Sequence, residues 1–188
     1  MLPQPPKRAL FIFDGPNFYK NLRQNGLEKG HLDFYELARN LASPRIIVDV
    51  IYFTSPVDQQ SEPDNYAGQQ KFFANLKASG VTLRTGNLVP RRRTCSACGT
   101  ETIFKVEKSL DVQIAMELIL GCIEDRYDVA YLATCDADLV PAISYVRGKG
   151  KDVFLLWPEG SDCFGVSSAC RVTIPIKQET LNAAQPKP

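Results

Sequence analysis

The sequence has almost no excess of charge of either sign, and it lacks long hydrophobic runs. Its 22 Lys and Arg residues nearly balance its 21 Asp and Glu residues, which leaves a formal net charge of +1. The overall charge therefore does not attract nucleic acid, and any such attraction must come from local basic clusters. No apolar stretch approaches the ~18 residues of a transmembrane helix, so we expect no association with a membrane.

Histidine is nearly absent, since His31 is the only one, and the sequence contains no internal repeat and no low-complexity block. A chain of 188 residues fits one domain and buries enough apolar surface to fold without disulfides. The beginning of the sequence is too rich in proline and too short for a secretory signal. The six cysteines are therefore expected to be reduced thiols in a cytoplasmic protein.

Strand signals alternate with helix signals along the sequence, which is typical of an α/β protein. Strands are predicted at residues 9–14, 46–53, 81–84, 127–133, 152–157 and 172–176, and helices at residues 17–24, 33–42, 64–79, 110–124, 138–148 and 162–170. Because parallel strands need right-handed crossovers, we predict a three-layer α/β/α sandwich with a mostly parallel central sheet. The helix at 110–124 is apolar on nearly every side and is expected to be buried.

We predict a single domain over residues 8–176. Residues 86–107 are irregular and basic, and they are predicted to form a protruding hairpin that contains two cysteines. Residues 1–7 and 178–188 are rich in proline and small or polar residues, and they are expected to be flexible tails.

Acidic residues stand at the ends of predicted buried strands. Asp14 ends one apolar run, Asp136 and Asp138 follow another, and Asp111 opens the long apolar helix. The carboxyl ends of parallel strands lie at one edge of a sheet, where ligands of open α/β proteins bind. Carboxylates gathered there repel one another unless a cation lies between them, and their hard oxygen atoms suit Mg²⁺ or Mn²⁺.

Each acidic motif also has a purely structural interpretation. Asp14 begins an ordinary turn sequence, and Asp111 could cap the helix that it opens. Asp136 or Asp138 could cap the next helix, but one cap needs one aspartate. Two aspartates separated by a single small residue exceed that need.

Taken in this order, the motifs resemble the NYN family of the PIN-domain-like nucleases, including its LabA-like group. The resemblance is carried by Asp14-Gly15-Pro16-Asn17, by Lys108-Ser109-Leu110-Asp111, and by Asp136-Ala137-Asp138-Leu139-Val140-Pro141. It implies a PIN-like, Rossmann-like sheet, one or two divalent ions, and cleavage of RNA to a 5′-phosphate and a 3′-hydroxyl. By the same resemblance, Asp14, Asp111, Asp136 and Asp138 hold Mg²⁺ or Mn²⁺, and Asn17 lies beside the scissile phosphate.

The sequence departs from the family pattern at two places. The family has Ser-Gly-Asp-Ser-Asp at its second acidic cluster. In this sequence Thr134 replaces the first serine and keeps a hydroxyl for contact with the substrate, whereas Ala137 replaces the second serine and has no hydroxyl. The Lys-Gly before the helix aspartate is Lys108-Ser109-Leu110 here. The retained Lys108 could neutralise charge on the phosphoryl oxygens. A metal ion would neutralise the phosphate, lower the pKa of bound water and align the attack.

The predicted hairpin carries a local basic cluster that the total charge hides. Arg91, Arg92 and Arg93 are adjacent in the sequence. They are either a solvated loop or, beside the acidic site, a clamp for the phosphates of single-stranded RNA. Phe104 and Tyr19 either stack on bases or belong to the core.

The same hairpin contains Cys95 and Cys98, which have the spacing of half a zinc site. No second cysteine pair or histidine follows nearby, so two free thiols in a tight turn are the preferred interpretation. Zinc would need further ligands from Cys163, Cys170 or a second chain. The oligomeric state is open, and a homodimer is one of the alternatives.

Other functional classes fit the sequence less well. A non-catalytic RNA-binding or regulatory module usually loses one or more carboxylates, whereas all four remain here. A haloacid-dehalogenase-like phosphatase needs a second acid where this sequence has Pro16, and a dinucleotide-binding domain needs a Gly-x-Gly-x-x-Gly motif after the first strand. We therefore predict a metal-dependent endoribonuclease.

Overall fold

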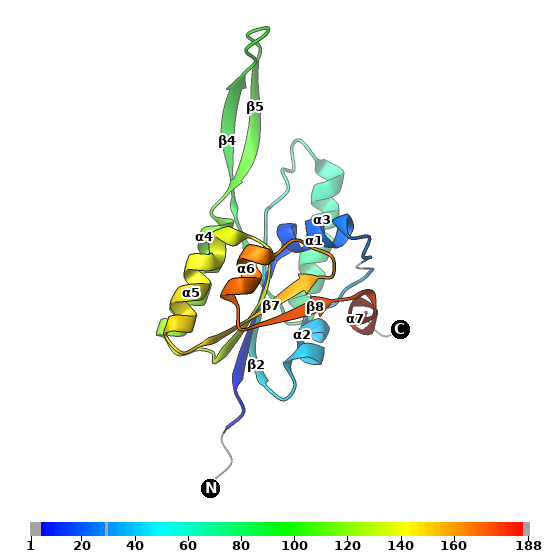
Figure 1. The fold of residues 1–188 in the computed structure, drawn as a ribbon. Coiled ribbons are helices and arrows are strands. Elements are labelled where there is room, and N and C mark those ends of the chain that lie inside the picture. The colour runs from blue at the N-terminus through cyan, green and yellow to red at the C-terminus, as the bar shows by residue number, and fades with distance from the viewer. Residues whose placement is uncertain (1–4, 29, 186–188) are drawn as a thin grey trace.

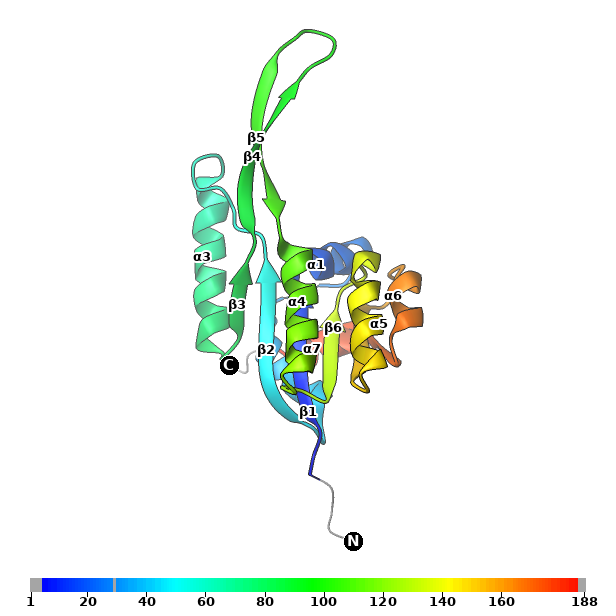
Figure 2. The ribbon, with the colours of Figure 1, turned by 90° about the vertical axis from the view of Figure 1, so that its left-hand side faces the viewer.

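The computed structural model describes residues 5–28 and 30–185 and contains a six-stranded sheet with helices on both of its faces (Figures 1 and 2). The strands of this sheet are β1 (Arg8–Asp14), β2 (Ile46–Thr54), β3 (Thr82–Thr85), β6 (Val129–Ala133), β7 (Asp152–Pro158) and β8 (Val172–Ile176). Their order is β3-β2-β1-β6-β7-β8, and all neighbouring pairs are parallel. The predicted α/β sandwich is confirmed.

The helices cover the two faces of the sheet with separate apolar clusters. They are α1 (Gly15–Gln24), α2 (Phe34–Ala42), α3 (Pro63–Ala78), α4 (Leu110–Ile123), α5 (Val140–Gly148), α6 (Phe164–Ala169) and α7 (Gln178–Ala183), with a single 3-10 turn η1 (Ala137–Leu139) before α5. Buried side chains of α1, α2, α3 and α7 belong to one cluster, and those of α4, α5 and α6 belong to the other. Among the described helices, none is both long and apolar enough to cross a lipid bilayer.

Residues 87–108 form the predicted hairpin. Strands β4 (Asn87–Thr94) and β5 (Glu101–Lys108) pair antiparallel in a separate sheet, which projects beyond the rest of the molecule (Figures 1 and 2). An eight-residue strand rises about 27 Å at roughly 3.4 Å per residue. The Lys105 ammonium binds the Asp58 carboxylate at 2.8 Å, which ties the lower part of this arm to the loop before α3.

The C-terminal segment differs from its prediction as a flexible tail. Residues 178–183 form helix α7, because Leu181 and Ala184 are fully buried against the first cluster. The backbone N–H of Asp33 also donates to the carbonyl of Ala184 at 2.9 Å. Residues 1–4 and 186–188 of the predicted tails lie outside the described residues.

Helix α4 is less buried than predicted. Val112, Met116 and Leu120 lie four residues apart on its outer face and are 64%, 45% and 40% exposed. Only the opposite face, with Leu110, Ile114 and Leu118, packs on the sheet. The apolar composition of the helix is therefore not a measure of its burial.

Candidate active site

The direction of strand order reverses between β1 and β6, and the candidate site lies at the carboxyl ends of these two strands. Phe13 pairs with Ala133, so Asp14 and Thr134 follow at the same edge. Such a switch point is where open α/β sheets bind ligands. Helix α1 begins directly after Asp14, and a Cβ atom at Gly15 would collide with the Tyr52 ring. Glycine is therefore required at this position.

Asp14 is a buried carboxylate, with only 3% of its surface exposed. Its Oδ2 accepts a hydrogen bond from the Thr134 hydroxyl at 2.8 Å, and its Oδ1 accepts one from the Asn17 backbone N–H at 3.3 Å. Burial raises the pKa of Asp14 to about 6, and the nearby charges of Asp111 and Asp136 act in the same direction. The two hydrogen bonds oppose this rise without cancelling it.

Asp136 and Asp138 have different structural roles. Asp136 caps η1, because its Oδ1 accepts the Asp138 backbone N–H at 2.9 Å. The Asp138 carboxylate is exposed and, among the residues that the structure describes, caps neither η1 nor α5. Asp136 thus performs the capping role, and the Asp138 carboxylate is available for a ligand.

Asp111 lies in the first turn of α4, but another residue caps this helix. Glu107 Oε1 accepts the backbone N–H of Leu110 at 2.9 Å. The carboxylate of Asp111 is exposed, and partial desolvation together with the charges of Asp136 and Asp138 raises its pKa. Three separate elements therefore bring four acidic side chains within electrostatic reach of one another.

The chemistry of this donor set fits a hard divalent cation. Within residues 5–28 and 30–185, none of the four carboxylates forms an ion pair with Lys or Arg, so their mutual repulsion is not neutralised by the protein. The described residues contain no group of three His, Cys, Asp or Glu side chains already arranged around a metal position. Mg²⁺ usually keeps several waters and binds one or two carboxylates directly. It therefore does not require such a group.

Thr134 and Asn17 hydrogen-bond to Asp14 and to the loop after β6. The Thr134 hydroxyl donates to Asp14 and accepts the Asp136 backbone N–H at 3.1 Å, and the side chain is 2% exposed. The Asn17 Oδ1 accepts the Cys135 backbone N–H at 2.9 Å, which joins α1 to the loop after β6. Thr134 thus orients Asp14 from a buried position, whereas the partly buried Asn17 side chain holds the loop after β6.

The basic residues lie along the hairpin rather than around the carboxylates. Arg91 pairs with Phe104, and Arg93 pairs with Thr102. At roughly 3.4 Å per residue, Arg91 is about 14 Å along the arm from Lys108. Alternation places Lys108, Arg91, Arg93 and Phe104 on one face of the hairpin and Arg92 on the other. Tyr19, by contrast, packs edge-on against Phe34 and Phe72 in the core.

The expectation that every cysteine is a free thiol is wrong for one pair. Cys135 and Cys163 form a disulfide with a Cα–Cα distance of 4.6 Å, which lies in the usual range. Cys135 follows β6 and Cys163 immediately precedes α6, and 28 residues of sequence separate them. Their proximity arises from the parallel sheet, which returns both segments to the same edge.

Ser109 shows a constraint that the sequence analysis missed. Its φ angle is 80°, in the left-handed region, directly before α4. This conformation costs a residue with a Cβ atom roughly 1 kcal/mol, and glycine adopts it freely. The family motif has a glycine at the position of Ser109, and that glycine indicates a left-handed backbone conformation.

We expect Ser109→Gly to raise the melting temperature by about 2 °C, because the relief of backbone strain exceeds the greater flexibility of glycine in the unfolded chain. Ser109→Ala serves as the control, since it also loses the hydroxyl that accepts from Gln113 but keeps the strained angle. Thermal unfolding followed by circular dichroism measures the difference. Equal melting temperatures for the two variants would contradict the assignment of strain.

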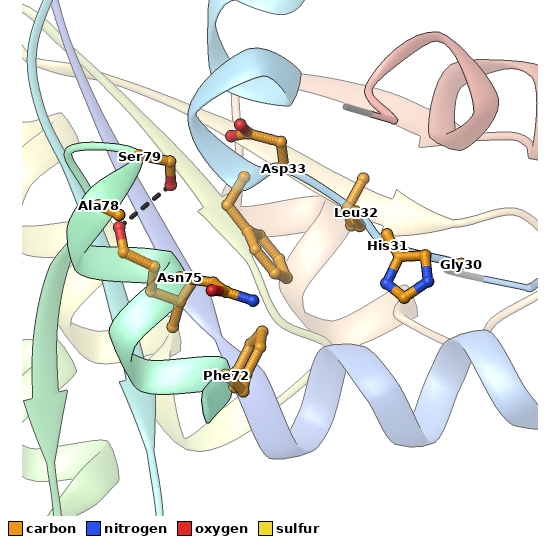
Figure 3. Close-up of a pocket in the computed structure, with 10 residues that line it drawn as sticks. Gly30, His31, Leu32, Asp33, Phe72, Asn75, Ala78 and Ser79 are labelled. Carbon is orange, nitrogen blue, oxygen red and sulfur yellow. Dashed lines mark hydrogen bonds between the residues drawn. The ribbon is translucent and has the colours of Figure 1, made fainter. Parts of the chain in front are cut away.

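A separate pocket lies far from the acidic edge. It has a volume of about 460 Å³ and lies between the loop before α2 and the last turns of α3, with His31, Phe72 and Asn75 among its lining residues (Figure 3). Helix α3 ends where β3 begins, which is the opposite edge of the sheet from Asp14. None of the four acidic residues lines this pocket.

Comparisons with known proteins agree with this architecture. A solved structure from Vibrio parahaemolyticus, the protein of unknown function VPA0982, superposes with a TM-score of 0.70 at 16% sequence identity. The match covers 94% of this chain and 96% of the other chain, so the two proteins share their fold over nearly their whole length. No curated protein sequence matches. The family model of the NYN domain matches residues 7–176, nearly the whole sequence, and the chain therefore belongs to the NYN domain family.

Proposed function

We propose that this protein is an endoribonuclease that hydrolyses phosphodiester bonds of single-stranded RNA with Mg²⁺ or Mn²⁺. The observation that carries the proposal is the convergence of four carboxylates from three elements without a cationic partner among the described residues. Membership of a nuclease-like family supports the same reaction class. The family resemblance, including that to its LabA-like group, implies products with a 5′-phosphate and a 3′-hydroxyl.

The metal ligands in this proposal are Asp14, Asp111, Asp136 and Asp138. Asp14 is deprotonated above its pKa of about 6 and then presents a negative charge at the sheet edge. The Thr134 hydroxyl keeps its carboxylate oriented, and the Asp138 N–H does the same for Asp136. A Mg²⁺ or Mn²⁺ held by these residues would neutralise charge on the phosphate and lower the pKa of bound water.

The hairpin holds the substrate in this proposal. Lys108 lies at its base, next to α4, and is exposed. Arg91 and Arg93 continue the same basic face, and the 42% exposed Phe104 ring opposite Arg91 offers a surface on which a base can stack. Arg92 faces the other way and contributes less to this path.

The proposed location is the cytoplasm. Cys95, Cys98, Cys122 and Cys170 are free thiols, as expected in a reducing compartment. The Cys135–Cys163 disulfide is the exception, and it lies beside the carboxylates rather than on the hairpin.

The decisive test compares the wild type with Asp136→Asn plus Asp138→Asn on labelled single-stranded RNA. We expect the double variant to cleave at least ~10³-fold more slowly, because loss of metal ligands removes several kcal/mol of transition-state stabilisation. EDTA should stop the wild type, and Mg²⁺ or Mn²⁺ should restore it.

The matched control removes two exposed carboxylates elsewhere, with Glu124→Gln plus Glu179→Gln. This control should keep the wild-type rate. Equal cleavage by all three preparations would identify a contaminating nuclease. Binding of RNA without cleavage by any of them would favour a non-catalytic RNA-binding module.

A further inference from the structure

The tip of the hairpin contains a two-cysteine turn that the proposed nuclease reaction does not use. Cys95 directly follows β4, and its backbone N–H donates to the Thr100 carbonyl at 2.9 Å. The Gly99 backbone N–H donates to the Cys95 carbonyl at 2.9 Å, and Gly99 has a positive φ angle of 71°. Both cysteines are free and exposed.

This turn brings the two sulfur atoms together, and the Cys98 thiol donates a hydrogen bond to the Thr100 hydroxyl oxygen. Cys98 Sγ lies 3.2 Å from the Thr100 hydroxyl. Thr100 and the Cys95 side chain both hydrogen-bond with the Cys98 thiol, which holds this sulfur in place beside that of Cys95. Hydrogen bonds from outside the ligand set orient the side chains that bind a metal ion. The turn is thus a preformed pair of ligands for a soft metal ion.

The fold prevents the rest of the chain from completing this site. Cys122 and Cys170 are buried in the core cluster on the α4 face, and Cys163 is paired with Cys135. Within the described residues, no third His, Cys, Asp or Glu joins the pair. The ligands from Cys163 or Cys170 considered from the sequence are therefore excluded, because the arm carries its tip away from them (Figures 1 and 2).

We propose that one Zn²⁺ joins two copies of this chain at their hairpin tips, with Cys95 and Cys98 of each copy as its four ligands. Structural zinc sites are almost always tetrahedral with four protein ligands, and thiolates favour Zn²⁺ over Mg²⁺. Each copy supplies half of the set. The tips project beyond the domains, so two of them can meet without overlap of the rest of the molecules (Figure 1).

The residues around the hairpin tip favour a zinc-linked contact between two copies of the chain. Four thiolates and one Zn²⁺ carry a net charge of −2, and Arg93 lines a hollow of about 520 Å³ together with Cys95 and Phe104. An arginine from each copy therefore lies near the negatively charged centre. Ile103 is 64% exposed on the other face of the hairpin and offers apolar surface to a second tip.

The test measures zinc content and mass of the full chain purified under reducing conditions. We expect about one Zn²⁺ per two chains, by elemental analysis, and a dimer by light scattering. Chelation should raise the dissociation constant of the dimer at least ~100-fold. Co²⁺ in place of Zn²⁺ should give the visible absorption of a tetrahedral tetrathiolate site.

The variant Cys95→Ser plus Cys98→Ser should be a zinc-free monomer with an unchanged melting temperature, because both side chains are exposed. The control Cys170→Ala alters a cysteine outside the site and should keep both zinc and dimer. Zinc held by a monomer, one zinc per chain, no zinc in the wild type, or a dimer broken by reductant but not by chelator would each overturn the proposal. None of these readouts depends on nuclease activity.

Discussion

We expect Asp14→Asn to lower the rate of RNA cleavage at least ~10³-fold and, in the same protein, to raise the free energy of unfolding without metal. A residue that only supports the fold would give the opposite change in stability. The combination arises because Asp14 is buried beside the charges of Asp111 and Asp136. Asparagine has a similar shape, carries no charge, and can keep one of the two hydrogen bonds that Asp14 makes.

The sign of the stability change depends on pH. The pKa of Asp14 is about 6 in the folded protein and 3.8 in its reference state, so the folded state binds more protons between these values. Stability of the metal-free wild type therefore falls as the pH rises from about 4 to about 6, by at most roughly 3 kcal/mol. The stability of Asp14→Asn does not fall over this pH range, because asparagine does not titrate there. Allowing for one lost hydrogen bond, we expect it to be more stable by about 1–2 kcal/mol at pH 7.5.

Urea unfolding in EDTA at pH 4.5 and pH 7.5 measures this difference, and Mg²⁺ should restore stability to the wild type alone. Asp128→Asn is the matched control at the opposite edge of the sheet. Asp128 accepts hydrogen bonds from the Arg8 backbone at 2.7 Å and from its guanidinium, which hold the pKa of Asp128 far below its usual value. This control should lose about 1–2 kcal/mol of stability and retain cleavage. An Asp14→Asn variant less stable than the metal-free wild type would contradict a functional role for the Asp14 carboxylate.

A second large effect is expected from the basic face of the hairpin. Arg91→Gln plus Arg93→Gln should weaken binding of single-stranded RNA by ~10-fold or more at low salt and leave the rate of the bound complex unchanged. Two phosphate contacts on single strands account for a change of about 1.4 in the slope of log K against log salt. Fluorescence anisotropy over a series of salt concentrations measures both quantities.

The single variant Arg92→Gln tests whether the face of the hairpin matters. It has the same chemistry as Arg91→Gln and differs only in the direction of the side chain. We expect Arg91→Gln or Arg93→Gln to weaken binding by a few-fold each, and Arg92→Gln by less than about 2-fold. Equal effects at all three positions would mean that the arginines act as a diffuse charge.

Local patterns predicted most of the secondary structure and the place of the acidic residues. A strand that is apolar at every position, such as residues 9–13, is covered on both faces and must be central. The residues that follow such a strand then lie at the carboxyl edge, which is why the sequence predicts Asp14 and Asp136 at one place. The cap of helix α2 is equally local, since the Asp33 carboxylate accepts the backbone N–H groups of Tyr35 and Glu36.

Other features depend on segments that are distant in sequence, and no local pattern carries them. Leu181 makes a helix of the expected tail only because the first core cluster offers it a surface. Cys135 and Cys163 meet because the crossover through α5 brings β7 back to the edge where β6 ends, and the arginines divide between two faces because β4 pairs with β5. The amino-acid order thus specified the strands, their burial and the charges at their ends. Packing between remote parts of the chain settled which thiols pair, which cations share a face and which apolar side chains remain exposed, since these depend on neighbours in space rather than in sequence.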